Sequence, residues 1–210
     1  IPLRLVGSEM CIRDRYYPFP KNDYENLLLQ IVNVSIESDI PQYAGMNVST
    51  ARKLKQLLAV IAKSVPFKPN ISSLASVLNV SRNSVADYCL YIEEAGMIAQ
   101  LRDDTGGIRG LGKVNKIYLD NTNLIYALGR EGVEIGNVRE TFFFNQLRVN
   151  QDVITSSVSD FKIDGYTFEV GGRKKGQKQI EGIDNAFVVK DDIEYGHGNV
   201  IPLWTFGFNY

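Results

Sequence analysis

The dipeptide Asp164-Gly165 lies between two stretches in which apolar and polar residues alternate, FKI and YTFEV. This combination predicts a two-residue type I′ hairpin, because both central positions of that turn require a positive φ. In the register set by such a turn, Asp160 lies opposite Glu169 on the same face of the hairpin. Like charges directly across a strand pair are destabilising, so we expect a cation, a nearby lysine or protonation of one acid to offset them.

Two interpretations of the acidic pair stay open at this point. The two carboxylates belong to a metal-type site, or they lie on a solvated hairpin face where Lys162 offsets their charge. Composition does not separate them. The chain has 210 residues, 44% of them hydrophobic, and a formal charge of -1, which suits one domain or two small ones and gives no global basic field.

Cysteine content and hydropathy limit the class of protein. Cys11 and Cys89 make neither a metal cluster nor a disulfide framework, and no apolar run has the length of a membrane span. We therefore expect a cytoplasmic protein without a membrane partner. Residues 1–15 contain LVGSEMCIRDR, which resembles translated sequencing-adapter read-through, so we exclude them from fold reasoning; a natural disordered N-terminus is the alternative.

Residues 16–120 read as helices followed by a strand pair. A connecting helical segment over 16–48 is predicted, with Asn22 as N-cap and an end before Asp39-Ile40-Pro41. Three helices follow, one from Ser49, one over 71–78 and one capped by Ser81, and then MIAQLR, a glycine-rich loop and VNKIYLD. This order predicts a winged helix-turn-helix over residues 49–120.

The predicted winged helix has a mixed charge pattern. Its candidate nucleic-acid contacts are Arg82, Arg109, Lys113 and Lys116. The third helix carries Arg82 as its one base against three acids, which favours a structural or protein-contact role over reading DNA.

The glycine-rich loop also matches a phosphate-loop pattern up to Lys113. Val114 replaces the magnesium-binding Ser/Thr, however, and a strand rather than a helix is predicted next, so we predict no ATP site here.

Residues 121–210 predict an α/β layer with a mixed sheet, which makes the fold class α+β. A short helix over 121–129 and a helix opened by Gly136-Asn137 are followed by strands and by a predicted helix over 177–181. The predicted strands cover residues 153–155, 159–163, 166–170, 186–189 and 201–206. The aromatic tail with Trp204 is interpreted as a terminal strand that closes the core.

An acid in the second of these helices, Glu140, together with Asp160 and Glu169 on the hairpin, resembles the PD-(D/E)XK, or restriction-endonuclease-like, fold. The DIP segment, the winged helix, KIYLDNTNLIYALG, GNVRETFFFNQLR and FEVGG together resemble the C-terminal half of a family of bacterial and archaeal AAA-type ATPases with an uncharacterised nuclease-like domain. The likeness covers residues 16–210. It implies a nuclease-like domain over residues 121–210 and an ATP-binding part that precedes this sequence.

The resemblance implies that Glu140, Asp160 and Glu169 would bind Mg²⁺ and that a lysine two residues after the last acid would position the attacking water. Gly171 occupies that position, so Lys174 or Lys175 would have to replace the missing lysine. First-turn helix electrostatics is the alternative explanation for Glu140.

The leading hypothesis is a non-catalytic region that docks onto nucleic acid, protein partners or the ATPase domain. The alternatives are an active Mg²⁺-dependent nuclease and a winged-helix regulator that binds DNA.

Overall fold

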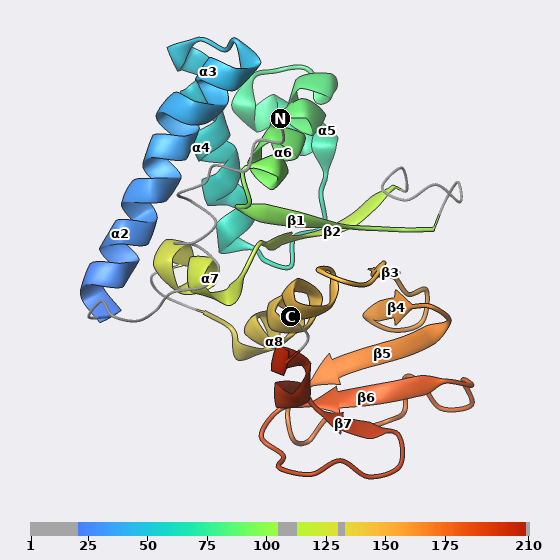
Figure 1. Ribbon diagram of the computed structural model, residues 1–210. Coiled ribbons are helices and arrows are strands. Elements are labelled where there is room, and N and C mark those ends of the chain that lie inside the picture. Colours follow the sequence, from blue (N-terminus) through green and yellow to red (C-terminus); the bar gives the residue numbers. More distant parts are fainter. Residues whose placement is uncertain (1–20, 105–112, 130–132, 209–210) are drawn as a thin grey trace. The chain divides into compact units, whose positions relative to one another are not determined.

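The computed structural model describes residues 21–104, 113–129 and 133–208 (Figure 1). The chain has a mixed α+β fold and forms two compact units. The first unit contains the chain through Gln100 together with Ile117–Val133, and the second contains Leu101–Lys116 and Glu134–Tyr210. Within the described ranges, no helix is both long enough and apolar enough to cross a bilayer.

The first unit begins with a helical path that does not break where we expected. Helix α2 (Lys21–Val34) continues into a π-helical turn, η1 (Ser35–Asp39), and then into α3 (Ile40–Ala44). The predicted end before Asp39-Ile40-Pro41 is therefore wrong. Pro41 lies at the start of α3, directly after the π-helical turn, and Gly45 with φ 63° ends the helix instead.

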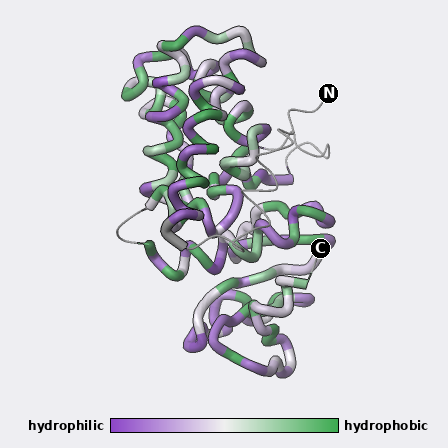
Figure 2. Tube along the Cα trace, turned by 60° about the vertical axis from the view of Figure 1, so that its left-hand side comes forward, coloured by the Kyte–Doolittle hydropathy of each residue, from purple (hydrophilic) through white to green (hydrophobic). Residues whose placement is uncertain are grey.

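The next three helices each begin at a side-chain cap. In α4 (Val48–Lys63), α5 (Ile71–Leu78) and α6 (Arg82–Glu94), the side chains of Asn47, Asn70 and Ser81 accept a hydrogen bond from the backbone N–H three residues on. The predicted cap at Ser81 is confirmed, whereas α4 starts before Ser49. Leu54, Leu57 and Ile61 of α4 are fully buried. In Figure 2, green and purple alternate along the helical turns of the tube, as in amphipathic helices.

Two strands and a helix follow. The predicted strands are confirmed as β1 (Ile98–Arg102) and β2 (Val114–Leu119), so a strand does follow Lys113. Phe67, between α4 and α5, forms an antiparallel bridge with Ile117 of β2 through two hydrogen bonds of 2.8 Å. The glycine-rich loop over residues 105–112, with Arg109, lies outside the described residues. Helix α7 (Thr122–Gly129) comes next.

The second unit contains helix α8 (Ile135–Leu147) and the rest of a seven-stranded mixed sheet with the order β2-β1-β3-β4-β5-β6-β7. Its strands are β3 (Ile154–Thr155), β4 (Phe161–Ile163), β5 (Tyr166–Gly171), β6 (Ala186–Lys190) and β7 (Val200–Pro202). The β3, β4 and β5 neighbours are antiparallel, and β5, β6 and β7 run parallel side by side (Figure 1). Phe143 of α8 contacts Phe161 and Phe168, so α8 covers the face that carries these rings.

The predicted hairpin is confirmed in turn and register. Asp164 and Gly165 have φ values of 46° and 86°, and Ile163 pairs with Tyr166. Continued past β4, the same register puts Asp160 opposite Glu169. The backbone N–H of Val170 donates to Asp160 Oδ2 at 3.0 Å, which fixes the Asp160 side chain against β5. The turn therefore brings the two acids together.

Two predicted elements in this unit are wrong. Residues 177–181 form turns rather than a helix, although Ile180 is buried with Ala186 and Val188. The last strand ends at Pro202, and the aromatic tail forms a 3-10 helix, η2 (Leu203–Phe208). Only part of that tail closes the core, because Phe206 contacts Phe143 while Trp204 remains 54% exposed.

Gly165→Ala should destabilise the chain by about 1–2 kcal/mol, because a Cβ at φ 86° pays the left-handed penalty of an L-residue. Midpoints of thermal unfolding would measure it. Gly176→Ala is the control, since Gly176 is exposed with open space around it. Equal midpoints for the two variants would contradict the type I′ turn.

Candidate active site

Three acids predicted from the sequence lie near one another in the second unit, with two lysines. We call Lys116, Glu140, Asp160, Glu169 and Lys175 the acid–lysine cluster. Glu140 is the sixth residue of α8, Asp160 directly precedes β4, and Glu169 lies within β5. Because Glu140 is in the second turn of α8, the explanation by first-turn helix electrostatics is wrong.

Lys116 bridges two of these acids. Its Nζ lies 3.2 Å from Glu140 Oε2 and 3.6 Å from Asp160 Oδ1. The three side chains are between 15% and 20% exposed, so the contacts are partly withdrawn from solvent but not closed off from it. A single ammonium group thus serves as counter-ion for a helix acid and a strand acid.

Glu169 is the most deeply buried acid of the cluster, at 1% exposure. Ser159 Oγ donates to its Oε2 at 2.7 Å, and Lys175 Nζ forms an ion pair with its Oε1. The alternative of a solvated hairpin face is therefore wrong for Glu169. Lys162 is exposed and pairs in register with Thr167, so it is not the counter-ion.

The side chain of Lys175 occupies the space above Gly171. A Cβ built on Gly171 would lie 2.6 Å from Lys175 Cγ and 2.7 Å from its Cβ and Cδ. Side chains alternate along a strand, so this space is on the same face of β5 as Glu169. Lys175 therefore brings an ammonium group to the side of the strand where residue 171 offers none. Lys174, the other predicted replacement, is exposed.

The charges of the cluster act on one another. Burial and the negative charge of Glu140 raise the pKa of Asp160 to about 6, and Glu169 adds to the effect, while the Val170 N–H and Lys116 oppose it. Burial alone would lower the pKa of Lys175, but its bond to Glu169 and the charges of all three acids outweigh this and raise it. Perturbed groups concentrated in one place are typical of functional sites.

The donor set suits a magnesium-type cation only in part. No three His, Cys, Asp or Glu side chains within the described ranges lie where they could hold one metal ion together. Glu140 and Asp160 nevertheless surround one point that a positive charge, the Lys116 ammonium, already occupies. Mg²⁺ is commonly held by one or two carboxylates plus substrate phosphates. The cluster therefore fits a two-carboxylate cation site.

The predicted nucleic-acid contacts that the structure describes are divided between the units, with Arg82 in the first and Lys113 and Lys116 in the second. Arg82 is exposed in the first turn of α6, and Lys113 is exposed next to β2, where its N–H bonds to Asp103 Oδ1 at 2.8 Å. Lys116 belongs to the acid–lysine cluster instead. One acid of α6 has a structural role, because Glu93 accepts two hydrogen bonds of 2.7 Å from Gln100.

Sequence reasoning missed two partners of the acids. Lys116 is 24 residues before Glu140 and was assigned to the wing, and no local pattern links the two residues. Ser159 precedes Asp160 directly, and its place next to that acid on the predicted hairpin was the available signal. A further ion pair, Arg139 Nε to Asp191 Oδ2 at 2.9 Å, ties α8 to the end of β6.

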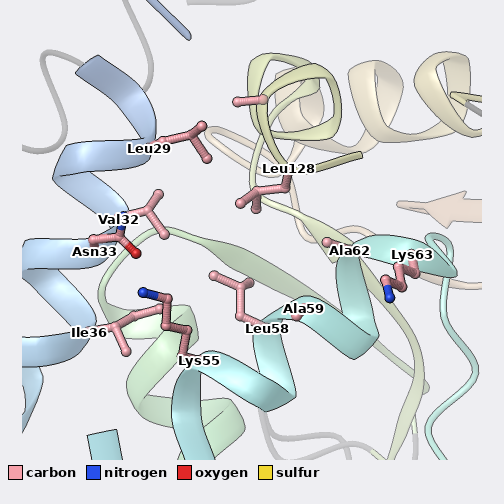
Figure 3. Close-up of a pocket in the computed structure, with 11 residues that line it drawn as sticks. Leu29, Val32, Asn33, Ile36, Lys55, Leu58, Ala59, Ala62, Lys63 and Leu128 are labelled. Atoms are coloured by element: carbon pink, nitrogen blue, oxygen red, sulfur yellow. The ribbon is translucent and has the colours of Figure 1, made fainter. Parts of the chain in front are cut away.

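The first unit contains a pocket of about 310 Å³ (Figure 3). Its lining is mostly apolar and comes from α2, η1, α4 and α7. Lys55 lines it, but its Nζ is 2.8 Å from Glu37 Oε1. With few polar groups to orient a ligand, this pocket is a weaker candidate than the acid–lysine cluster.

Fold and site together define a mixed α+β protein with a paired acid–lysine cluster in its second unit. The chain belongs to the family DUF8612, a domain of unknown function, which matches residues 18–134. That range includes Lys116 and ends before the three acids. No curated protein and no solved structure matches the chain.

The stability of the protein should depend on pH through Asp160. Its pKa is higher in the folded chain, about 6, than the ordinary 3.8, so the folded state binds the proton more tightly and loses stability as pH rises from about 4 to 6. Asp160→Asn should remove this loss. The variant should match the wild type below pH 4 and exceed it at pH 7 by up to about 3 kcal/mol.

Denaturant unfolding of both proteins at several pH values would measure the difference. A wild type that is the more stable of the two at pH 7 would show that Lys116 and the Val170 N–H hold the charged form of Asp160 more strongly than burial and the other acids oppose it.

Proposed function

We propose that the second unit is a restriction-endonuclease-like domain with a magnesium-dependent nuclease site. One observation carries the proposal: Lys175 covers Gly171 and pairs with Glu169. Gly171 leaves the strand without the lysine that cleavage would require at this position. Lys175 reaches the same side of β5 from four residues further along and supplies an ammonium group there.

The physical cost of the cluster supports a role in binding or chemistry. Three carboxylates within electrostatic reach of one another, one of them at 1% exposure, are an unfavourable arrangement for a purely structural element. The residues on the opposite face of β5, Phe168 and Val170, supply the apolar packing. The apolar packing of this strand therefore does not come from the acids.

Four residues of the cluster have a direct role in this proposal. Asp160 and Glu140 hold the cation, which would stabilise charge on a phosphodiester. Lys175 and Glu169 orient a water molecule. The water oxygen bonds to phosphorus while the phosphorus–oxygen ester bond to the leaving group breaks, and the proton lost by the water ends on the departing alkoxide.

The order of elements also supports a winged helix in residues 49–120. Helix α4, the bridging residue Phe67, α5, α6 and the pair β1 and β2 follow one another as helix, strand residue, helix, helix, strand, strand. Together with the sequence resemblance, this supports the proposal that the chain is the C-terminal region of a cytoplasmic AAA-type ATPase, whose ATP would bind outside this chain.

Purified protein with Mg²⁺ or Mn²⁺ should cut plasmid or single-stranded DNA. Asp160→Asn and Glu169→Gln should each lower the rate by about 100-fold or more, because oriented charged groups commonly contribute that much. Gel electrophoresis of timed digests would measure the rates. Lys162→Gln is the matched control, since Lys162 is exposed on the same hairpin and should leave the rate unchanged. DNA that stays intact with either metal would refute the proposal.

Docking without cleavage is the second candidate function, and the winged helix favours it. Arg82 is exposed at the N-terminal turn of α6, and the two hydrogen bonds of Glu93 to Gln100 direct that acid toward β1. Helix α6 therefore repels a phosphate backbone less strongly than its count of acidic residues indicates. If the chain docks without cleaving DNA, the acid–lysine cluster binds a DNA strand or a protein partner, and the ATPase part supplies the chemistry.

Docking predicts duplex DNA binding that weakens steeply with salt. Arg82→Ala and Lys113→Ala should each make the negative slope of log K against log salt shallower by about 0.9, the value for one phosphate contact. Fluorescence anisotropy at several salt concentrations would measure the slopes. Lys162→Ala serves as control. Unchanged slopes for the first two variants would exclude these residues from the interface.

A further inference from the structure

The resident positive charge between Glu140 and Asp160 comes from the chain itself. Lys116 lies in β2, far from both acids in sequence, yet its Nζ is within 4 Å of a carboxylate oxygen of each. Glu169 has its own counter-ion in Lys175, and the two lysines thus divide the three acids between them.

A metal ion and the Lys116 ammonium would compete for the same oxygens. Inner-sphere coordination of Mg²⁺ requires carboxylate oxygens at about 2.0–2.1 Å from the ion, which leaves no room for an ammonium group at hydrogen-bond distance from the same point. The side chains of Lys116, Glu140 and Asp160 are about equally exposed, so solvent and small ions reach all three. Lysine is suited to withdraw, because its ammonium group sits on a flexible four-carbon stem.

We propose that Lys116 is a built-in competitor for the divalent cation of this site, and that the cation enters only by exchange with the Lys116 ammonium. The inference rests on the proposed nuclease function. Lys116 is a positioning residue in this scheme: it holds Glu140 and Asp160 together before the cation arrives and sets the affinity for that cation.

Exchange and simple charge pairing predict different effects of substitution. If Lys116 only holds the acids in place, removing its charge disorders them and weakens metal binding. If Lys116 competes, the neutral variant Lys116→Gln binds the metal more tightly, since its amide still donates a hydrogen bond but carries no charge. Lys116→Arg keeps the charge, and its fork can engage both carboxylates, so it should bind the metal no more tightly than the wild type.

The experiment is a titration of the full chain with Mn²⁺, followed by the electron paramagnetic resonance signal of the unbound ion. Lys116→Gln should lower the dissociation constant about tenfold or more, which corresponds to about 1.4 kcal/mol. Lys162→Gln, on the hairpin that carries Asp160, should match the wild type. Asp160→Asn identifies the site by abolishing the binding, and circular dichroism verifies that each variant is folded.

Two outcomes would overturn the inference in distinguishable ways. If the wild type binds Mn²⁺ at a site that needs Asp160 and Lys116→Gln binds it equally or more weakly, competition is refuted while the proposed function stands. If neither the wild type nor Lys116→Gln binds Mn²⁺, the metal site and the proposed nuclease both fail. Should Lys116→Gln not fold, tighter binding by Lys116→Arg than by the wild type would refute the inference.

Discussion

The burial of one carboxylate, that of Glu169, is the constraint on which the second unit depends. A charged group at 1% exposure requires both a hydrogen-bond donor and a counter-ion, and the chain supplies Ser159 and Lys175. Ser159 must therefore lie beside β5, which the tight turn at Asp164-Gly165 ensures. Lys175 must fold back over β5, which requires residue 171 to have no side chain. The hairpin, Gly171 and the turn after β5 together stabilise the buried charge of Glu169.

The same arrangement stabilises the charged form of Asp160 less well than that of Glu169. Its backbone partner and Lys116 stabilise the charged form, but burial and the two other acids raise its pKa to about 6. With this pKa, the Asp160 carboxyl changes its protonation state just below neutral pH. An arrangement that stabilises Glu169 well and Asp160 poorly differs from a structural ion-pair network, which would pair each charge fully.

Local patterns predicted the elements and the hairpin well, because each depends on residues that are neighbours in sequence. The cap at Ser81, the helix over Ile71–Leu78 and the register of β4 with β5 are such cases. The prediction failed where tertiary contacts decide. Pro41 was interpreted as a helix end although it suits a first turn, and the segment with Ile180 was interpreted as a helix although a few turns suffice to bury that side chain. Asp160 and Glu169 were found from the turn and Glu140 from the family resemblance. The pairing of Lys116 with these acids was not predicted, because the contact joins β2 to α8 across 24 residues.

Gly171 has a consequence for how such sites are recognised in other chains. The ammonium group beside Glu169 comes from a turn rather than from the strand, so the distance in sequence between acid and lysine is not fixed by strand geometry. A glycine two residues after a strand acid, followed by a lysine-containing turn, can present the same charge as a lysine at the glycine position itself. A sequence motif with a fixed acid–lysine spacing would miss the lysine of such a chain. The chemically relevant pattern is a glycine two residues after the strand acid, with a lysine in the turn that follows.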